Sequence, residues 1–188
     1  MDKSRADENQ VLAWFRTMGL NPVRYSKKEM RKTGNKTPEF MVKKDDELLF
    51  YCEVKSIIGD VWENELRQDP TYNKIQNKIH EAVKQFRSVN RNREFPNVLV
   101  FKNNQYETDV IDLCSVLTGF FYADNGRRYR IYDSYSHGRI IKEKFFIDLY
   151  IWCQSDNTQQ FCLTLDSPFK NRLCRIFKID PENIKIIS

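Results

Sequence analysis

The feature that most constrains the fold is a short, uninterrupted apolar run in the middle of the chain, Val98 to Phe101, which follows an amphipathic segment, Thr71 to Val89. An apolar run of this length without polar alternation, placed after a helix, predicts a strand that is buried on both faces. The apolar residues of the amphipathic segment recur at helical spacing: Ile75, Ile79, Ala82, Val83 and Phe86. We therefore expect an α/β fold with a central mixed sheet flanked by helices.

The flanking segments extend this pattern. Residues 7–18 have helical spacing and end at Gly19, and residues 23–25 form a short extended piece. Two strand-like runs, 38–42 and 48–57, are joined by a polar turn and predict a hairpin. Residues 59–70 are expected to form a loop or a frayed helix. Further along, we expect a helix over 109–117, strands over 127–133, 139–152 and 161–165, turns at Asn125-Gly126 and His137-Gly138, and a closing helix over 168–177.

Composition restricts the class of protein. A chain of 188 residues favours one domain, here 1–188, with a core of about 7–102 and a C-terminal extension of about 109–188. The net charge of +5 suits a nucleic-acid partner. The five cysteines are odd in number and contain no C-x-x-C, which argues against a disulfide framework. Because no apolar run is long enough to cross a bilayer and the first residues lack an apolar leader segment, we expect a cytoplasmic protein with no membrane partner.

Two carboxylates and a lysine on the predicted hairpin form the candidate site. Glu39 belongs to the first strand-like run, and Glu53 and Lys55 belong to the second. Residues two apart on a strand point to the same face, so Glu53 and Lys55 should lie together. Paired carboxylates suit a hard cation such as Mg²⁺ or Mn²⁺, which can polarise a phosphodiester and activate water. Lys55 could then orient or deprotonate that water, or stabilise charge on the phosphate.

This arrangement, Pro38-Glu39 followed by Glu53-Val54-Lys55, resembles the PD-(D/E)xK nuclease superfamily, and the resemblance covers about half of the chain. It implies a restriction-endonuclease-like core with the order α-β-β-β-α-β. It also implies metal ligands at Glu39 and Glu53, at the Val54 carbonyl and at Glu8 in the first helix. The catalytic residues would be Glu39, Glu53, Lys55 and, on the following helix, Gln85. Position 39 departs from the usual pattern, because the first acid is more often aspartate.

The resemblance predicts a Mg²⁺- or Mn²⁺-dependent nuclease that hydrolyses phosphodiester bonds, with DNA favoured over RNA. Residues 24–36 are expected to form an exposed loop that holds the nucleic-acid backbone through Lys27, Lys28, Arg31, Lys32 and Lys36. Lys74, Lys78 and Gln85 share one side of the predicted helix and could line the same cleft. A second basic group, Arg127, Arg128 and Arg130 with Tyr129 and Tyr132, has two interpretations: a nucleic-acid contact or a solvated strand face.

Two other classes of function stay open at this point. The first is a nucleic-acid-binding module that kept the nuclease fold but does not catalyse cleavage. The glutamate at position 39, where aspartate is more usual, is the reason to consider it. The second is an interaction protein with no nucleic-acid role. The two histidines, His80 and His137, are too far apart in sequence to indicate a zinc site, and no phosphate-binding glycine motif occurs. A homodimer is also compatible with this sequence.

Overall fold

Strand β4 (Asn97–Asn103) lies at the centre of a mixed sheet, and all of its residues are buried. The sheet has the order β1-β2-β3-β4-β7-β8-β9, and β3, β4 and β7 are parallel to one another. The other strands are β1 (Asn21–Val23), β2 (Phe40–Lys44), β3 (Glu47–Ile57), β7 (Leu149–Cys153), β8 (Gln159–Thr164) and β9 (Lys185–Ile187). This computed structural model describes residues 3–34, 36–57, 70–105, 108–122, 127–130, 140–156, 158–164, 166–180 and 185–187.

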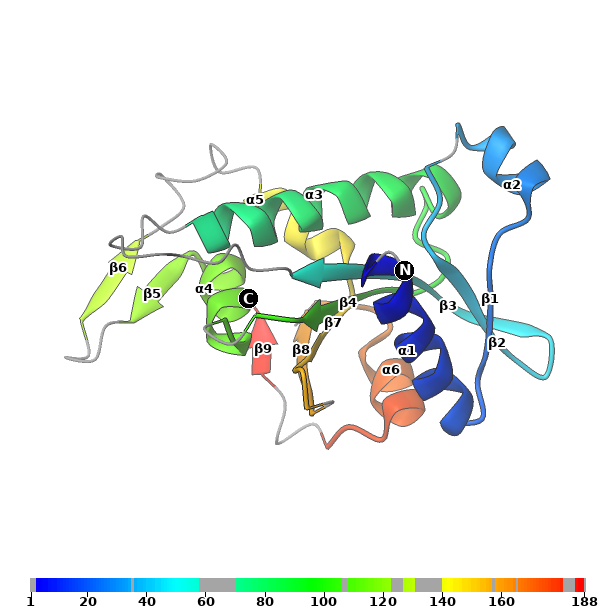
Figure 1. Ribbon diagram of the computed structural model, residues 1–188. Helices are drawn as coiled ribbons and strands as arrows, with labels where there is room; N and C mark the ends of the chain where they lie inside the picture. Colours follow the sequence, from blue (N-terminus) through cyan, green and yellow to red (C-terminus); the bar gives the residue numbers. More distant parts are fainter. Residues whose placement is uncertain are drawn as a thin grey trace.

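Helices cover the two faces of this sheet (Figure 1). One face carries α1 (Lys3–Thr17) and α6 (Lys170–Phe177), and the other carries α3 (Pro70–Val89), α4 (Val110–Thr118) and α5 (Ile140–Glu143). Burial of apolar side chains on both faces is what makes a strand such as β4 apolar at every position. The expected α/β class with a mixed, helix-flanked sheet is confirmed.

Two hydrophobic clusters form the core. The first, here called the α1–α6 cluster, lies between the sheet and the helices α1 and α6, and alternate residues of β3 point into it. In this cluster the ring centroids of Phe15, Phe50 and Phe177 lie 5.5–6.2 Å from one another. The apolar stripe of α3, from Ile75 to Phe86, is fully buried in the other cluster against β4 and α4. These clusters hold β3 between α1 and α3, and β3 carries two of the predicted site residues.

The predicted hairpin is confirmed. β2 and β3 pair in antiparallel fashion with Phe40 opposite Cys52, and the turn between them contains Asp45 and Asp46 at positive φ. Two consecutive residues at positive φ are typical of the tight hairpin turns whose twist matches that of the strands. The helix predicted over 7–18 is α1, and the chain leaves it through Gly19, at φ +75°.

Two predictions of local structure are wrong. Residues 24–36 are not simply a loop, because they contain a short helix, α2 (Lys27–Lys32). Ser26 and Glu29 form a capping box at its start, each side chain accepting a hydrogen bond from the other's backbone N–H. Residues 139–152 are not one strand: α5 and a 3-10 turn (Lys144–Phe146) precede β7.

Tertiary packing explains why residues 140–146 are helical and do not continue the strand β7. Ile140 and Phe146 pack into the hydrophobic cluster that α3 and α4 form with the sheet. The buried Lys144 Nζ donates a hydrogen bond to the Leu117 carbonyl at the end of α4. These contacts stabilise helical turns in a segment whose isoleucines and phenylalanines favour strands locally.

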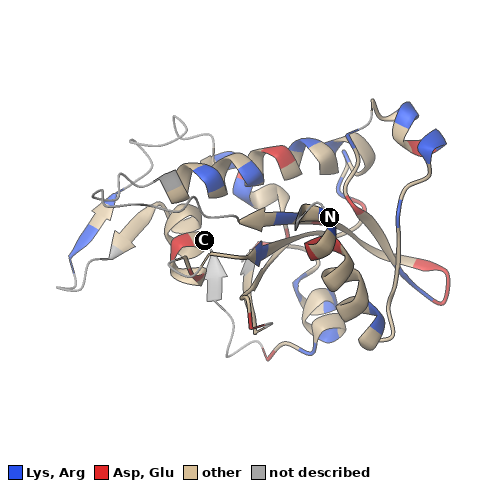
Figure 2. Cartoon of the chain, viewed as in Figure 1, with Lys and Arg blue, Asp and Glu red and all other residues tan. Residues whose placement is uncertain are grey.

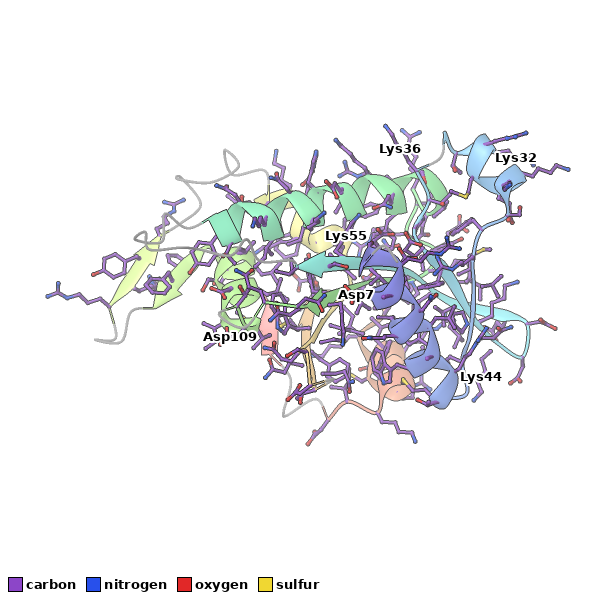
Figure 3. The ribbon with its side chains drawn as sticks, viewed as in Figure 1. Asp7, Lys32, Lys36, Lys44, Lys55 and Asp109 are labelled. Carbon is purple, nitrogen blue, oxygen red and sulfur yellow. The ribbon has the colours of Figure 1, made fainter. Side chains whose placement is uncertain are left out.

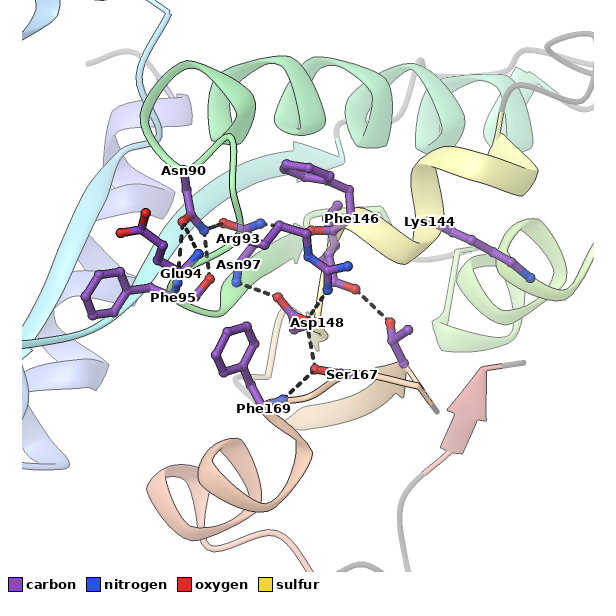
Figure 4. Close-up of polar contacts among 12 residues, drawn as sticks. Asn90, Arg93, Glu94, Phe95, Asn97, Lys144, Phe146, Asp148, Ser167 and Phe169 are labelled. Atoms are coloured by element: carbon purple, nitrogen blue, oxygen red, sulfur yellow. Dashed lines mark hydrogen bonds and ion pairs between the residues drawn. The ribbon is translucent and has the colours of Figure 1, made fainter.

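A polar network fixes the ends of β4 and β7 where they begin (Figure 4). Asp148 is fully buried and accepts hydrogen bonds from the Asn97 backbone N–H at 2.8 Å, from Ser167 Oγ at 2.7 Å and from Arg93 Nη2 at 2.6 Å. Asn90, just after α3, donates to the Phe95 carbonyl at 2.7 Å. The network therefore joins the loop after α3 to the start of two central strands and to the segment before α6.

Several predictions lie outside the described residues: the loop over 59–69, both predicted turns and Tyr132. Within the described part of the chain, β6 (Arg128–Arg130) pairs with β5 (Phe120–Tyr122) in a separate two-stranded hairpin. None of the five cysteines forms a disulfide, in line with the sequence, and four of them are buried. None of the described helices is long and apolar enough to cross a bilayer.

Candidate active site

Glu53 and Lys55 lie side by side on β3, on the face that points toward α3. The Glu53 side chain is 1% exposed, and its Oε1 lies 2.8 Å from Lys55 Nζ. Glu53 Oε2 accepts a hydrogen bond of 3.0 Å from the backbone N–H of Glu39. A buried carboxylate is stable only when it is paired and hydrogen-bonded, and here both of its oxygens have a partner.

Glu39 lies next to Glu53 across the hairpin. Phe40 pairs with Cys52, so Glu39 comes opposite Glu53, and residues opposite each other point to the same face. The carboxylate of Glu39 is 28% exposed, and its Oε2 lies 3.1 Å from Arg24 Nη1. The same Arg24 atom lies 2.7 Å from Glu8 Oε2 on α1. Arg24 thus joins two of the predicted metal-binding carboxylates.

Figure 3 shows Lys55 near α3, and this helix supplies the next set of contacts to its ammonium group. Lys55 Nζ donates a hydrogen bond of 3.0 Å to Gln85 Oε1 and lies 3.4 Å from Glu81 Oε2. Gln85 Nε2 in turn donates to the Thr37 carbonyl at 3.1 Å, just before Glu39. Residues four apart share one face of a helix, so Glu81 and Gln85 reach the same ammonium group. Gln85 bridges Lys55 and the segment that carries Glu39.

The environment shifts the pKa of Glu53, Glu39 and Lys55. Burial raises the pKa of Glu53 to about 7; the charge of Lys55 opposes this effect, and that of Glu39 adds to it. Burial and the neighbouring Glu8 raise the pKa of Glu39, against the opposing charge of Arg24. For Lys55, burial acts to lower the pKa, but the Glu53 carboxylate outweighs it, and the pKa of Lys55 lies above its usual value. Lys55 is therefore protonated at neutral pH.

Helix α1 is held against the end of the sheet by Asp7. Asp7 Oδ2 accepts hydrogen bonds from Ser56 Oγ at 2.6 Å and from Asn104 Nδ2 at 2.7 Å. Ser56 follows Lys55 on β3, and Asn104 follows β4. This anchor sets the position of the next residue, Glu8, beside Arg24.

A pocket of about 210 Å³ opens beside Glu39. It is lined by Arg24, Tyr25, Met30, Thr37, Pro38, Glu39 and Gln85. The Tyr25 hydroxyl is buried and has no hydrogen-bond partner among the described residues. Burial raises the pKa of Tyr25, and the charge of Glu53 adds to this shift, so the hydroxyl keeps its proton. A hydroxyl without a partner is unusual in a folded protein and marks a place where a ligand could accept its proton in a hydrogen bond.

The Val54 side chain packs in the α1–α6 cluster, away from Glu53, so only its backbone could serve the site. The Ile57 carbonyl accepts from the Asn104 N–H on the β4 side. Carbonyls alternate along a strand, so that of Val54 points toward the β2 side. β2 begins at Phe40, and Pro38, two residues earlier, has no N–H to donate. The Val54 carbonyl thus points beyond the end of the β2 ladder.

The predicted nucleic-acid contacts fall into two groups. The first group lies on α2 or just after it, and its residues are exposed: Lys27, Lys28, Arg31, Lys32 and Lys36. Figure 2 shows that basic residues are concentrated on α2. Those of the second group, Lys74 and Lys78, are half-buried on α3. Lys78 Nζ lies 3.8 Å from Glu81 Oε2, so it reaches the site only through Glu81.

Sequence reasoning missed three contributors to this site. Glu81 could have been found, because it lies four residues before Gln85 on the predicted helix. Arg24 was assigned to a phosphate-binding loop, whereas the structure places it between Glu8 and Glu39. Tyr25 carried no local signal, because its role depends on a pocket formed by segments distant in sequence.

The donor set fits a hard divalent cation in chemical type. Glu8 and Glu39 offer carboxylate oxygens that already share one cationic group, Arg24, and Mg²⁺ needs only one or two carboxylates besides water and phosphate oxygens. Among the residues that the structure describes, no three His, Cys, Asp or Glu side chains form a ready metal-binding group. No protein-family model, curated protein or solved structure matches this chain.

Proposed function

We propose that this protein is a metal-dependent nuclease that hydrolyses phosphodiester bonds in DNA, with Glu39, Glu53 and Lys55 at its centre. The observation that carries the proposal is the convergence on Glu53 of the Lys55 ammonium group and the Glu39 backbone, beside an open pocket. A buried acid whose pKa lies near 7, paired with a lysine whose hydrogen-bond partner Gln85 lines a pocket, is typical of catalytic sites.

Mg²⁺ or Mn²⁺ is the cofactor in this proposal. Glu39 and Glu53 would hold it, with the Val54 carbonyl and Glu8 as further donors. When bound, the ion would polarise the phosphodiester and lower the pKa of a bound water. The ion's charge also suits the site electrostatically, because it would offset the repulsion between Glu8 and Glu39 that raises the pKa of Glu39.

Lys55 acts in this proposal as a fixed positive charge. Because its pKa lies above the usual value, it stabilises negative charge on the phosphate and does not remove a proton from water. Gln85 keeps the ammonium group in place through its contact with Lys55 Nζ, and Gln85 is itself held by the Thr37 carbonyl. Tyr25 lines the same pocket, and its enclosed hydroxyl would donate to a phosphate oxygen that reached it.

The order of elements supports the resemblance to the PD-(D/E)xK superfamily. From α1 to β4 the chain runs α1-β1-β2-β3-α3-β4, with the short α2 inserted between β1 and β2. This corresponds to the expected order α-β-β-β-α-β, with the two acids on or beside the hairpin strands and the glutamine on the helix that follows. The exposed basic residues of α2 favour a nucleic-acid substrate for such a site.

The direct test is incubation with plasmid, linear duplex and single-stranded DNA, with Mg²⁺, with Mn²⁺ or with a chelator. We expect cleavage that requires a divalent ion. Glu53→Gln and Lys55→Ala should each lower the cleavage rate by about 100-fold or more, because each removes a charge that acts on the reacting phosphate. Cleavage by both variants at the wild-type rate would reject the proposal.

Matched controls separate catalysis from general changes in charge or folding. Glu94→Gln and Lys142→Ala remove the same charges from exposed positions outside the site and should leave the rate unchanged. Circular dichroism and thermal unfolding of all variants would show whether each remains folded. Loss of cleavage in the control variants would mean that overall charge, and not the site, controls the activity.

A second candidate is a nucleic-acid-binding module that does not cut. The observation that favours it is Arg24, whose guanidinium already contacts both Glu8 and Glu39 and so takes the place that a metal ion would need between them. Thermal unfolding during Mg²⁺ and Mn²⁺ titration distinguishes the two candidates, because an ion that binds the folded state raises the melting temperature by mass action. A binder without a metal site would bind DNA in a salt-dependent way and show no response to the ion.

A further inference from the structure

The β5–β6 hairpin lies apart from the central sheet, at one end of the molecule (Figure 1). β5 begins directly after α4, which ends at Gly119 in a left-handed conformation. Among the described residues the two strands form a sheet of their own, in the register Phe120–Arg130, Phe121–Tyr129 and Tyr122–Arg128. A two-stranded hairpin by itself is marginally stable in water, so we expect contacts with another surface to stabilise it. The side chains that the hairpin exposes indicate which kind of surface that is.

That surface combines exposed aromatic rings with basic side chains. Phe121 is 37% exposed and Tyr129 is 48% exposed, and their ring centroids lie 6.4 Å apart with an angle of 32° between the planes. Opposite residues of a hairpin share a face, so these two rings form one exposed aromatic surface. Large aromatic side chains contribute to core packing when buried; here they remain in contact with solvent.

Arginines adjoin this surface: Arg128 and Arg130 alternate with Tyr129 along β6 and so belong to the other face of the hairpin, and Arg127 comes two residues before Tyr129. Arg127, Arg128 and Arg130 are all exposed, and the described residues of the hairpin contain no aspartate or glutamate. The Arg128 guanidinium lies 4.2 Å from the centre of the Phe120 ring, which shows that arginine and aromatic side chains already stack within this element. Stacking rings interleaved with cations are what a nucleic-acid strand with exposed bases requires.

The hairpin also lies where a bound strand would pass. α4 leads into β5 and packs against α3, whose residues Glu81 and Gln85 contact Lys55. The part of α3 between Gln85 and its first residue is roughly 22 Å long at 1.5 Å per residue. Figure 2 shows basic residues on α2, on α3 around an acidic one, and on β6, so the elements between the candidate site and the hairpin carry positive charge.

We propose that the β5–β6 hairpin binds an unpaired segment of nucleic acid that wraps around it, with bases stacked on Phe121 and Tyr129 and phosphates held by the flanking arginines, Arg127 before β6 and Arg128 and Arg130 on the other face. This inference rests on the proposed function in one respect: the strand that it binds is the substrate of the candidate site. At 3.4 Å per nucleotide along a strand, the segment between site and hairpin spans on the order of five to ten nucleotides.

The test is fluorescence anisotropy in a chelator, with single-stranded DNA, single-stranded RNA and duplex DNA of 6 and 20 units. Phe121→Ala and Tyr129→Ala should each weaken binding of the 20-nucleotide single strands by about 5- to 100-fold, because each removes a stacking partner. A 6-nucleotide strand can occupy the hairpin alone, so the same variants should weaken its binding as well, whereas binding of duplex should change little. The DNA and RNA arms show whether both kinds of single strand are bound.

Two control variants make the result specific. Tyr129→Phe keeps the ring and should retain wild-type affinity. Ile111→Ala removes an exposed apolar side chain from α4 and should also have no effect. Because Phe121 and Tyr129 lie at the surface, their variants should unfold at the wild-type temperature, which thermal unfolding would check.

Three outcomes would overturn the inference: wild-type affinity for the long single strand in both alanine variants, an equal loss for duplex, or a change from oligomer to monomer on size exclusion, which would identify the hairpin as a contact between copies of this chain. Failure of the proposed function is distinguishable, because it would appear as absence of metal-dependent cleavage by the wild type while strand binding in chelator persists.

Discussion

Glu53 is buried within the sheet and is also a proposed metal ligand, so the fold directly sets the protonation of a residue that the proposed chemistry uses. Burial of a carboxylate on a central strand opposes its ionisation, while Lys55 favours it, and the balance brings the pKa of Glu53 to about 7. The neighbouring acid across the hairpin, Glu39, adds repulsion and has a raised pKa of its own. The metal-free protein therefore holds Glu53 between its protonated and ionised forms near neutral pH.

This balance predicts a pH dependence of stability in the absence of metal. The folded state binds the Glu53 proton more tightly than the unfolded chain, whose glutamate has a pKa of 4.5. The stability that Glu53 contributes is thus fully present below pH 4.5 and is lost as the pH rises through about 7. Measured by urea unfolding in chelator, the free energy of unfolding of the wild type should fall between pH 5 and pH 8 relative to that of Glu53→Gln.

The glutamine variant is the appropriate reference, because it resembles the protonated acid in shape and does not titrate. Glu94→Gln, at an exposed position, serves as the control and should follow the wild type. If the wild type and Glu53→Gln show the same pH dependence, the buried acid does not titrate in this range and the proposed balance is wrong.

At the scale of single residues, the sequence predicted the pairs that depend on regular periodicity. Glu53 and Lys55 are two apart on a strand, and Gln85 lies on the predicted helix that covers that strand. It did not predict the partner of Glu8 and Glu39, because the position of Arg24 depends on how β1 pairs with β2. Nor did it predict that the Tyr25 hydroxyl is enclosed without a partner. Such contacts are set by tertiary packing, which a linear pattern does not encode.

Helix α2 is the element whose role can be tested most cleanly. Its four basic residues, Lys27, Lys28, Arg31 and Lys32, are exposed and lie near the pocket, to which α2 contributes Met30. If they contact phosphates, their replacement by alanine should reduce the steepness with which log K falls with log salt by about 0.9 for each lost contact with duplex DNA. DNA binding measured from low to moderate salt would give this slope.

The control removes the same number of charges elsewhere, from Lys44, Lys142, Arg175 and Lys178. This second variant has the same net charge as the first, so a difference between their slopes reports the location of the contacts. Identical slopes in the two variants would show that DNA responds to overall charge and that α2 is a solvated helix.

At the scale of elements, long periodic segments were predicted well and short ones were not. α3 and β4 have strong patterns that tertiary contacts reinforce. α2 was missed although its capping box, Ser26 to Glu29, is visible in the sequence. α5 was read as strand because its residues favour strands, and the buried contact of Lys144 with the end of α4 is not local. Non-local contacts decide the structure where local preference is weak or misleading.

The whole molecule depends on its C-terminal half more than the proposed core of about 7–102 suggests. β4 pairs with β7 along Val98 to Lys102. Both hydrophobic clusters also draw residues from beyond that core, among them Trp152 and Phe177. Without these partners β4 would be an exposed edge strand with uncovered apolar residues.

A chain truncated after Gln105 should therefore fail to fold cooperatively, even though it contains every residue of the candidate site. Far-ultraviolet circular dichroism and urea unfolding would test this, with the full-length chain as reference. A truncation after residue 180, which removes β9 and keeps β7, β8 and α6, should retain a cooperative transition. A sharp unfolding transition in the shorter chain would show that the first half is an independent unit.

The guanidinium between Glu8 and Glu39 has a consequence for how the protein tolerates changes in its surroundings. It acts as a tethered counter-ion: its local concentration is set by the chain and does not fall on dilution or dialysis. The folded protein can therefore hold Glu8 and Glu39 close together without an ion from solution. Any ion that enters the site has to compete with the guanidinium of Arg24, which is covalently attached to the chain.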